Sequence, residues 1–211
     1  TTGGPEYIWE DIQSVGTTVS MTLDDQMSSQ IYIGFSFPFY GNSYTYLRIC
    51  SNGFVSFTST DTDWSNDPIP DATEPNDIIA PFWDDLSPQN GGNVKYYRDM
   101  TNGRFIMQFT DVDHYVGTWT GEYTFQMQLY ADGTIMFFYN EMEGDVDTCT
   151  IGIENSSGDD GLQIVNDDDY MEDNLAIKIY MPPEWITITP HSGVVEGGET
   201  AQIQLDLDSN K

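Results

Sequence analysis

The residues best suited to chemistry in this chain are carboxylate pairs that stand where strand-like runs give way to loops. Asp84 and Asp85 lie in FWDDL, and Asp111 and Asp113 lie in TDVDHY. In an extended strand, side chains two residues apart share a face, so Asp111 and Asp113 are expected to point the same way. Hard carboxylate oxygens from neighbouring strand ends can converge on one Ca²⁺ ion. We therefore predict one Ca²⁺ site, formed by Asp84, Asp85, Asp111 and Asp113.

The alternative for these residues is a set of solvated acidic loop ends. Two other acidic stretches are weaker candidates for a metal site. In DTDWSND, residues 61–67, the EF-hand glycine at the sixth position and the glutamate at the twelfth are missing. The run NDDDYMED, residues 166–173, is typical of a simple acidic loop.

No known catalytic pattern is present in the sequence. There are two histidines, His114 and His191, and no Gly-x-Ser-x-Gly, His-Glu-x-x-His or phosphate-binding glycine loop. A lone histidine beside Asp113 is more typical of a solvated loop than of a catalytic base. The sequence therefore predicts a protein that is not an enzyme, although a glycosidase-like carboxylate pair stays open as an alternative.

The composition limits the partners that the chain can bind. Its 211 residues include 35 acidic and only 6 Lys and Arg residues, which gives a formal charge of −29. Such a charge disfavours nucleic acid and anionic membranes, because both require basic patches. No apolar run approaches the roughly 18 residues of a membrane span. No signal peptide is visible at Thr1, so we expect a processed chain or a fragment.

The sequence pattern predicts an all-β fold, an antiparallel β-sandwich. Asn52-Gly53, Asn102-Gly103 and Asp132-Gly133 each separate two strand-like runs, within residues 44–59, 94–112 and 122–140. These dipeptides favour two-residue type I′ turns. In the third hairpin, one face carries Tyr123, Phe125, Met127 and Leu129. We expect this face in the core and the opposite face, Thr124, Gln126, Gln128 and Tyr130, in solvent.

Two irregular segments divide the chain. Residues 58–77 are rich in Pro, Asp and Ser, which predicts a surface loop. Met181-Pro182-Pro183 marks a domain boundary, after which a strand-like pattern begins again. We therefore expect a large domain at residues 1–181 and a partial β segment at residues 182–211.

Five blocks of sequence carry a family resemblance: IGFSFPFYGNSYTYLRICSNGFVSF, NDIIAPFWDDL, GRFIMQFTDV, YTFQMQLYADGTIMFFYN and TIGIENSSGDDGLQI. Over residues 31–165 they resemble a β-sandwich module of bacterial and archaeal surface proteins, distantly similar to the nidogen extracellular (NIDO-type) domain. The tail, PPEWITITPHSGVVEGGETAQIQLDLDSN, resembles the first half of an Ig-like (BACON-like) module. The resemblance implies a secreted, non-enzymatic prokaryotic protein at the cell surface.

Two cysteines stand where members of that family often have Ser or Ala. Cys50 and Cys149 lie about 100 residues apart, and a disulfide between them would stabilise the fold by roughly 4–5 kcal/mol in the chain-entropy model. A secreted protein favours this bridge. The alternative is a pair of buried free thiols.

The two ends of the chain predict self-assembly. Residues 200–207 alternate as a strand whose apolar face is Ala201, Ile203, Leu205 and Leu207. That face is covered by the same chain, by strands missing from a truncated module, or by another copy. We favour another copy, with pairing of strands between subunits into a fibre. The leading segment supplies a second inserting strand, with Tyr7, Ile8, Trp9 and Ile12.

The competing hypothesis is an adhesion module that binds a glycan or matrix protein. It would bind through loops such as residues 114–120, and its candidate residues are the loop aromatics Trp64, Tyr115 and Trp119. These aromatics can equally cap the core. Asn155-Ser156-Ser157 is a single acceptor sequence for glycosylation at Asn155. Expected partners are other copies of the chain or neighbouring surface modules.

Overall fold

The computed structural model describes most of the chain, namely residues 4–115, 120–181, 186–189 and 202–207. Two compact units make up the protein, Thr1–Ile179 and Tyr180–Lys211. Every regular element in the described residues is a β-strand. No helix long and apolar enough to cross a membrane occurs in that part of the chain.

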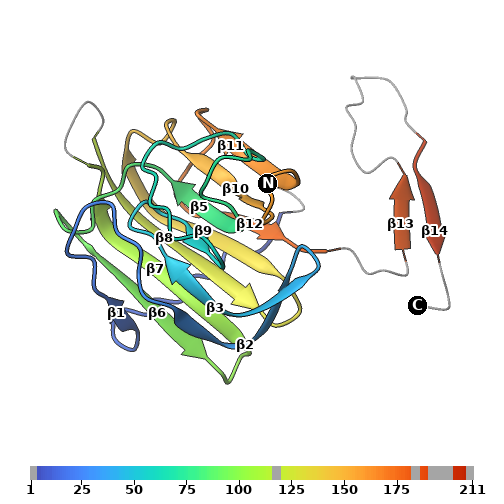
Figure 1. Ribbon diagram of the computed structural model, residues 1–211, viewed down its shortest axis with the longest axis horizontal. Coiled ribbons are helices and arrows are strands. Elements are labelled where there is room, and N and C mark those ends of the chain that lie inside the picture. Colours follow the sequence, from blue (N-terminus) through green and yellow to red (C-terminus); the bar gives the residue numbers. More distant parts are fainter. Residues whose placement is uncertain (1–3, 116–119, 182–185, 190–201, 208–211) are drawn as a thin grey trace. The chain divides into compact units, whose positions relative to one another are not determined.

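The first unit is a sandwich of two six-stranded sheets, which confirms the predicted antiparallel β-sandwich (Figure 1). The first sheet has the order β1 (Thr17–Val19), β6 (Asn93–Asp99), β7 (Arg104–Asp113), β8 (Gly121–Tyr130), β9 (Ile135–Gly144) and β12 (Leu175–Ile179). The second has the order β11 (Gly161–Asn166), β10 (Thr150–Glu154), β5 (Ile78–Trp83), β4 (Val55–Ser56), β3 (Asn42–Ile49) and β2 (Ile31–Phe39). All neighbouring strands within each sheet are antiparallel.

Aromatic side chains join the two sheets. The apolar face of β8 is fully buried in the core, as its alternation predicts. Phe82 of β5 packs against Tyr123 and Phe125 of β8 with ring separations of 4.7 and 5.7 Å, and within the first sheet Phe109 stacks on Phe125 at 4.7 Å. Aromatic pairs of this kind stabilise a core beyond the area that they bury.

The hairpin turns differ from the predicted two-residue type I′ turns. Four residues separate β6 from β7, and four separate β8 from β9. In the two loops only Gly103 and Gly133 have a positive φ, whereas a type I′ turn needs two consecutive residues there. The Asn-Gly and Asp-Gly dipeptides therefore predicted the positions of these two hairpins correctly, but the predicted type I′ turn was wrong.

The polar face of β8 is not solvated, contrary to the prediction. Gln126 and Gln128 are fully buried, because residues 5–13 of the chain lie over this outer face of the first sheet. Gln126 Nε2 donates to the Glu10 carbonyl at 2.8 Å, and Gln108 Oε1 accepts from the Ile12 amide at 3.1 Å. Arg104, itself buried, pairs with the Glu10 carboxylate.

The leading segment is consequently not the inserting strand that the sequence suggested. Residues 5–12 form no strand, and Ile12 is fully buried where this segment lies over the outer face of the first sheet. Tyr7 packs edge-on against Phe138 at 5.7 Å, Trp9 is half-buried, and Ile8 is exposed. The backbone and side chains of this segment thus already contact the first sheet of the same chain.

A second irregular segment covers the outer face of the other sheet. Residues 58–77 contribute Ile69 to a small hydrophobic cluster with Cys50, Phe54, Ile78, Ala80 and Trp83. Trp83 Nε1 donates to the Asp63 carbonyl at 2.9 Å and so ties the segment to β5. The predicted surface loop is therefore also a covering layer, which explains why every residue of β5 is buried.

The predicted disulfide is absent, because Cys50 and Cys149 are both buried free thiols. Cys50 belongs to the small cluster beneath residues 58–77, whereas Cys149 belongs to the main core between the sheets. The two side chains therefore serve as small apolar residues in different parts of the fold.

The second unit contains an antiparallel hairpin of β13 (Ile186–Thr189) and β14 (Gln204–Leu207). Its register pairs Ile188 with Leu205 and Ile186 with Leu207. Of the predicted apolar face, Ile203, Leu205 and Leu207 are 64%, 58% and 68% exposed, and Ala201 lies outside the described residues. The strand is thus shorter than the predicted 200–207, and the chain itself supplies one partner strand.

Candidate functional site

A well-anchored loop between β1 and β2 presents two adjacent carboxylates, Asp24 and Asp25. Gln26 organises this loop, because its Oε1 accepts from the amides of Thr22 at 2.8 Å and Leu23 at 2.9 Å. The Gln26 backbone amide donates to Ser51 Oγ at 2.9 Å. The loop is therefore tied both to itself and to the segment that follows β3.

Asn52 joins this loop to the segment that follows β5. Its Nδ2 donates to Asp25 Oδ1 at 2.8 Å, and its Oδ1 accepts from the Leu86 amide at 3.2 Å. Asn52 itself is fully buried. Gly53 must follow it, because φ is +77° there and a Cβ would lie 1.8 Å from the Phe82 carbonyl oxygen. A buried amide thus fixes both sides of the site.

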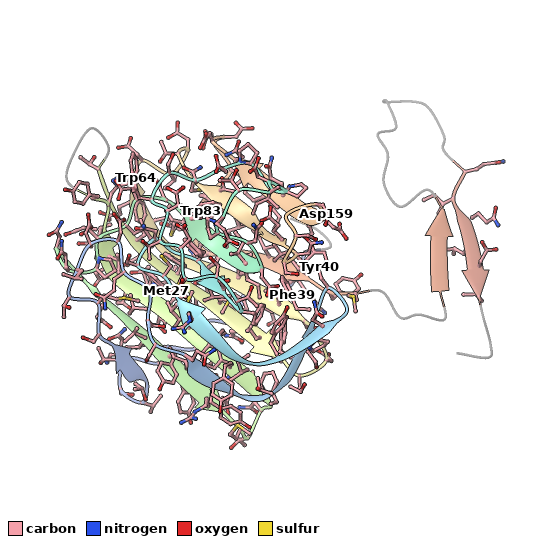
Figure 2. The ribbon with its side chains drawn as sticks, in the orientation of Figure 1. Met27, Phe39, Tyr40, Trp64, Trp83 and Asp159 are labelled. Carbon is pink, nitrogen blue, oxygen red and sulfur yellow. The ribbon has the colours of Figure 1, made fainter. Side chains whose placement is uncertain are left out.

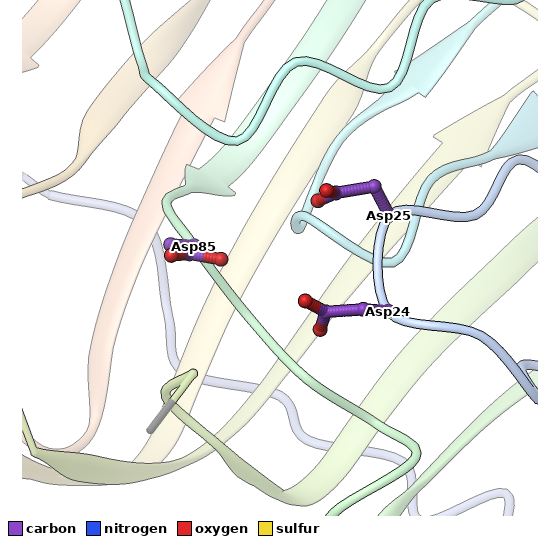
Figure 3. Close-up of side chains that lie close together, drawn as sticks. All are labelled: Asp24, Asp25 and Asp85. Atoms are coloured by element: carbon purple, nitrogen blue, oxygen red, sulfur yellow. The ribbon is translucent and has the colours of Figure 1, made fainter. Parts of the chain in front are cut away.

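These contacts bring Asp24, Asp25 and Asp85 together. One carboxylate oxygen of each lies within 4.8 Å of the others. Figure 3 shows the Asp24 and Asp25 side chains extending from one loop toward Asp85 on the segment after β5. Burial raises the pKa of Asp85 to about 6; His114 opposes this rise, and the charges of Asp24 and Asp25 add to it.

Two buried oxygens at this group lack hydrogen-bond partners among the described residues. They are Asp24 Oδ1 and the hydroxyl of Ser87, a fully buried residue. Burial raises the pKa of Asp24, and the Ser87 hydroxyl lies close enough to lower it, although no hydrogen bond of regular geometry joins the two. Both oxygens retain unused capacity to bind a ligand.

Asp84 does not belong to this group and forms a buried pair with His114. His114 Nε2 lies 3.3 Å from Asp84 Oδ1, and Thr148 Oγ1 donates to Asp84 Oδ2 at 2.9 Å. Burial disfavours the charged imidazole, but Asp84 reverses this effect, so the pKa of His114 is raised. With His114 only 6% exposed, the pair orders the strand ends and is poorly placed to act as a general base.

The four-carboxylate site predicted from the sequence does not form. Asp111 Oδ1 accepts from Thr124 Oγ1 at 3.0 Å on the outer face of the first sheet, where a bulge gives Asp111 a φ of +51°. The Asp113 carboxylate lies beside Gly91, and its carbonyl accepts from the Ser87 amide. Of the predicted residues, only Asp85 joins the close group of three acidic residues found in the described chain.

Sequence reasoning missed Asp24 and Asp25. The only signal was an Asp-Asp dipeptide in a turn-like stretch, TLDDQM, which gives no indication of a partner some 60 residues away. The contact with Asp85 depends on the packing of the two sheets, and no local pattern encodes it.

Comparison with known proteins identifies the sandwich. A family model described as NIDO related matches residues 4–178, beyond the 31–165 of the resemblance noted in the sequence. This chain belongs to the NIDO-related family. No solved structure matches it significantly.

Two curated relatives illustrate the reach of this family. "Dendrite extension defective protein 1" of Caenorhabditis elegans is 37% identical over 68 residues, which are 32% of this chain and 6% of that protein. Alpha-tectorin of Mus musculus is 29% identical over 139 residues, 54% of this chain and 6% of that protein. The chain thus covers a small part of each relative. Both are animal proteins, so they lend no support to the expected prokaryotic source. The family match ends at residue 178 and lends no support to an Ig-like tail.

Beside the buried pair, the NIDO-related domain has a hollow of about 430 Å³. Its lining includes Asp84, Asp85 and His114 together with Trp64. Trp64 is 55% exposed, whereas Trp83, also labelled in Figure 2, is buried. Tyr115, the residue after His114, is partly exposed, and Trp119 lies outside the described residues.

The predicted glycosylation residue of the NIDO-related domain lies in the turn between β10 and β11. Asn155 Oδ1 accepts from the amides of Ser157 and Asp159, both at 3.2 Å. Its Nδ2 donates to Asp159 Oδ1 at 2.7 Å. The side chain therefore organises this turn, and its modification stays a prediction.

Proposed function

We propose that this chain is a non-catalytic structural module of an extracellular protein, and that copies of it join through β14. The family supports the first part, because the NIDO-type resemblance implies a secreted module without catalytic residues. The small coverage of the animal relatives supports a module that works within a longer protein.

The exposed apolar row of β14 is the observation that carries the second part. β14 pairs with β13, and no other described strand pairs with its second edge. Leu205 and Leu207 are more than half exposed on the same strand. A free edge with an apolar row is a template for pairing with another chain.

The partner that fits this edge is a second copy of the chain. Backbone hydrogen bonds between strands supply affinity, and side-chain pockets on alternate residues supply specificity. A head-to-tail contact between different surfaces of identical copies closes into a ring if its rotation closes, and otherwise grows into the filament proposed here. Residues Tyr7 to Ile12 already pack against the sandwich of their own chain, so they have no part in this proposal.

The reactive side chains support a non-catalytic role. His114 is buried against Asp84, and His191 lies outside the described residues. Burial raises the pKa of Cys50 to about 12 and also raises the pKa of Cys149. A nucleophilic cysteine instead needs exposure and a lowered pKa.

The test compares two single variants on opposite faces of one strand. Leu205→Lys places a charge in the apolar row, and Gln204→Lys adds the same charge to the other face. Light scattering and negative-stain microscopy of the full chain should show assemblies for wild type and Gln204→Lys but not for Leu205→Lys. Wild-type protein that stays monomeric would overturn the proposal, as would equal loss of assembly in both variants.

Recognition of a glycan or matrix protein is the second candidate, favoured by the hollow beside Trp64. An exposed indole face next to carboxylates is an arrangement that can stack on a sugar and orient its hydroxyls. A glycan array probed with wild type and Trp64→Ala tests it. Binding that depends on Trp64 supports recognition, and no binding by wild type removes this candidate.

A further inference from the structure

We propose that Asp24, Asp25 and Asp85 form a Ca²⁺ site that links the β1–β2 loop to the segment after β5. The three carboxylates face one another across the gap between these two segments (Figure 3). This site shares only Asp85 with the one predicted from the sequence, and it is independent of assembly through β14.

The spacing of the carboxylate oxygens suits one ion. Ca²⁺ takes oxygen ligands at about 2.4 Å, so two ligands on opposite sides of it lie up to about 4.8 Å apart. The three oxygens of the group lie within 4.8 Å of one another. Each pair of these oxygens therefore lies within the span of one Ca²⁺ ion.

The loop that carries two of the ligands is already held in place. Asn52 fixes Asp25 through Oδ1, which leaves its other oxygen for the ion. The same amide holds Leu86, the residue after Asp85. Gln26 closes the loop from within. Ligands held in this way lose little conformational freedom when an ion binds.

The unpartnered buried oxygens are the independent sign of a missing ligand. Ser87 is fully buried, and its hydroxyl lies near the Asp24 carboxylate but forms no hydrogen bond of regular geometry with it or with any other described residue. Asp24 Oδ1 is shielded from solvent and equally unpartnered. Buried polar groups normally have partners. A Ca²⁺ ion at this point would be a partner for the Asp24 carboxylate, and the Ser87 hydroxyl would be a further oxygen ligand of the ion.

The donor set selects a hard cation. The group contains only oxygen donors, which favours Ca²⁺ or Mg²⁺ over Zn²⁺ or Cu²⁺. Two of the ligands come from a partly exposed loop, and Ca²⁺ tolerates such irregular geometry better than Mg²⁺, which requires a near-ideal octahedron. Extracellular Ca²⁺ modules have dissociation constants of about 10⁻⁴ to 10⁻³ M, and we expect this range here.

The experiment measures Ca²⁺ affinity and thermal stability of the full chain. Asp25→Asn removes one charge at the site but keeps the oxygen that accepts from Asn52. Asp168→Asn, in the exposed acidic stretch after β11, is the matched control for loss of one charge. Isothermal titration with CaCl₂ should show one site in wild type and in Asp168→Asn. Affinity should fall about tenfold or more in Asp25→Asn.

The melting temperature provides a second readout, in which a folding defect of the variant would not give the expected result. In EDTA, Asp25→Asn should melt at a higher temperature than wild type, because it relieves repulsion among three carboxylates. In millimolar Ca²⁺ the order should reverse, while equal MgCl₂ should shift wild type less. Absence of Ca²⁺ binding by wild type at 10-fold above the expected range, or equal affinity in wild type and Asp25→Asn, would overturn the proposal.

Discussion

Glu154 gives the most sharply defined prediction, because it is a carboxyl buried at the end of β10. Its side chain is only 2% exposed, and Oε2 accepts from the Asp71 amide at 2.6 Å. Burial raises its pKa from 4.5 to about 7, and the charges of Asp71 and Asp67 add to the rise. The folded protein therefore binds the Glu154 proton more tightly than the unfolded chain does.

The sign of the pH dependence follows from this difference. Stabilisation by the protonated carboxyl is complete below about pH 4.5 and is lost as pH rises through about 7. Each pKa unit corresponds to about 1.4 kcal/mol, so the loss is about 3 kcal/mol between these limits. Glu154→Gln keeps the side chain neutral at every pH. The Asn76 amide can turn to pair with either end of the new side chain.

The assay is urea unfolding at pH 4 and pH 8, followed by tryptophan fluorescence. At pH 4 wild type and Glu154→Gln should agree to within about 1 kcal/mol. At pH 8 the variant should be more stable by up to about 3 kcal/mol. Glu172→Gln, at an exposed residue, is the control and should show no such change between the two pH values. A Glu154→Gln variant that loses the same stability at both pH values would refute the reasoning.

Three further predictions concern packing. Cys50 and Cys149 should resist Ellman's reagent until the protein unfolds, and reducing agent should leave the melting temperature unchanged; a drop would reveal a disulfide. Gly53→Ala should cost about 3 kcal/mol or more in unfolding free energy, whereas Gly41→Ala, with the same φ of +77° but open space around it, should cost about 1–2 kcal/mol; equal costs would contradict the close contact. Ile12→Ala should cost about 2–5 kcal/mol by urea unfolding, and a cost below 0.5 kcal/mol would mean that the leading segment does not cover the sheet.

The strands with strict alternation were the most predictable part of this protein. Tyr123, Phe125, Met127 and Leu129 lie in the core because a period of two determines which face is apolar. The opposite face was mispredicted, because Gln126 and its neighbours are polar whether water or another segment covers them. The segment that covers them lies more than 100 residues away in sequence. No repeating pattern in the sequence of β8 indicates these contacts.

The candidate site was predictable only in part for the same reason. Asp85 was identified because it ends a buried strand, but its partners Asp24 and Asp25 belong to a distant loop. Asp111 was expected to join it, and a bulge in β7 with a positive φ instead directs its side chain to Thr124. Irregular backbone of this kind changes the direction of a side chain without a clear signature in the sequence.

Sedimentation velocity of the wild-type chain over a hundredfold range of concentration tests the central claim most directly. If copies join through the free edge of β14, the weight-average mass should rise above 23.8 kDa and continue to rise with concentration, without a plateau at the dimer. A single species at 23.8 kDa throughout would contradict the account and would leave ligand recognition near Trp64 as the function to pursue.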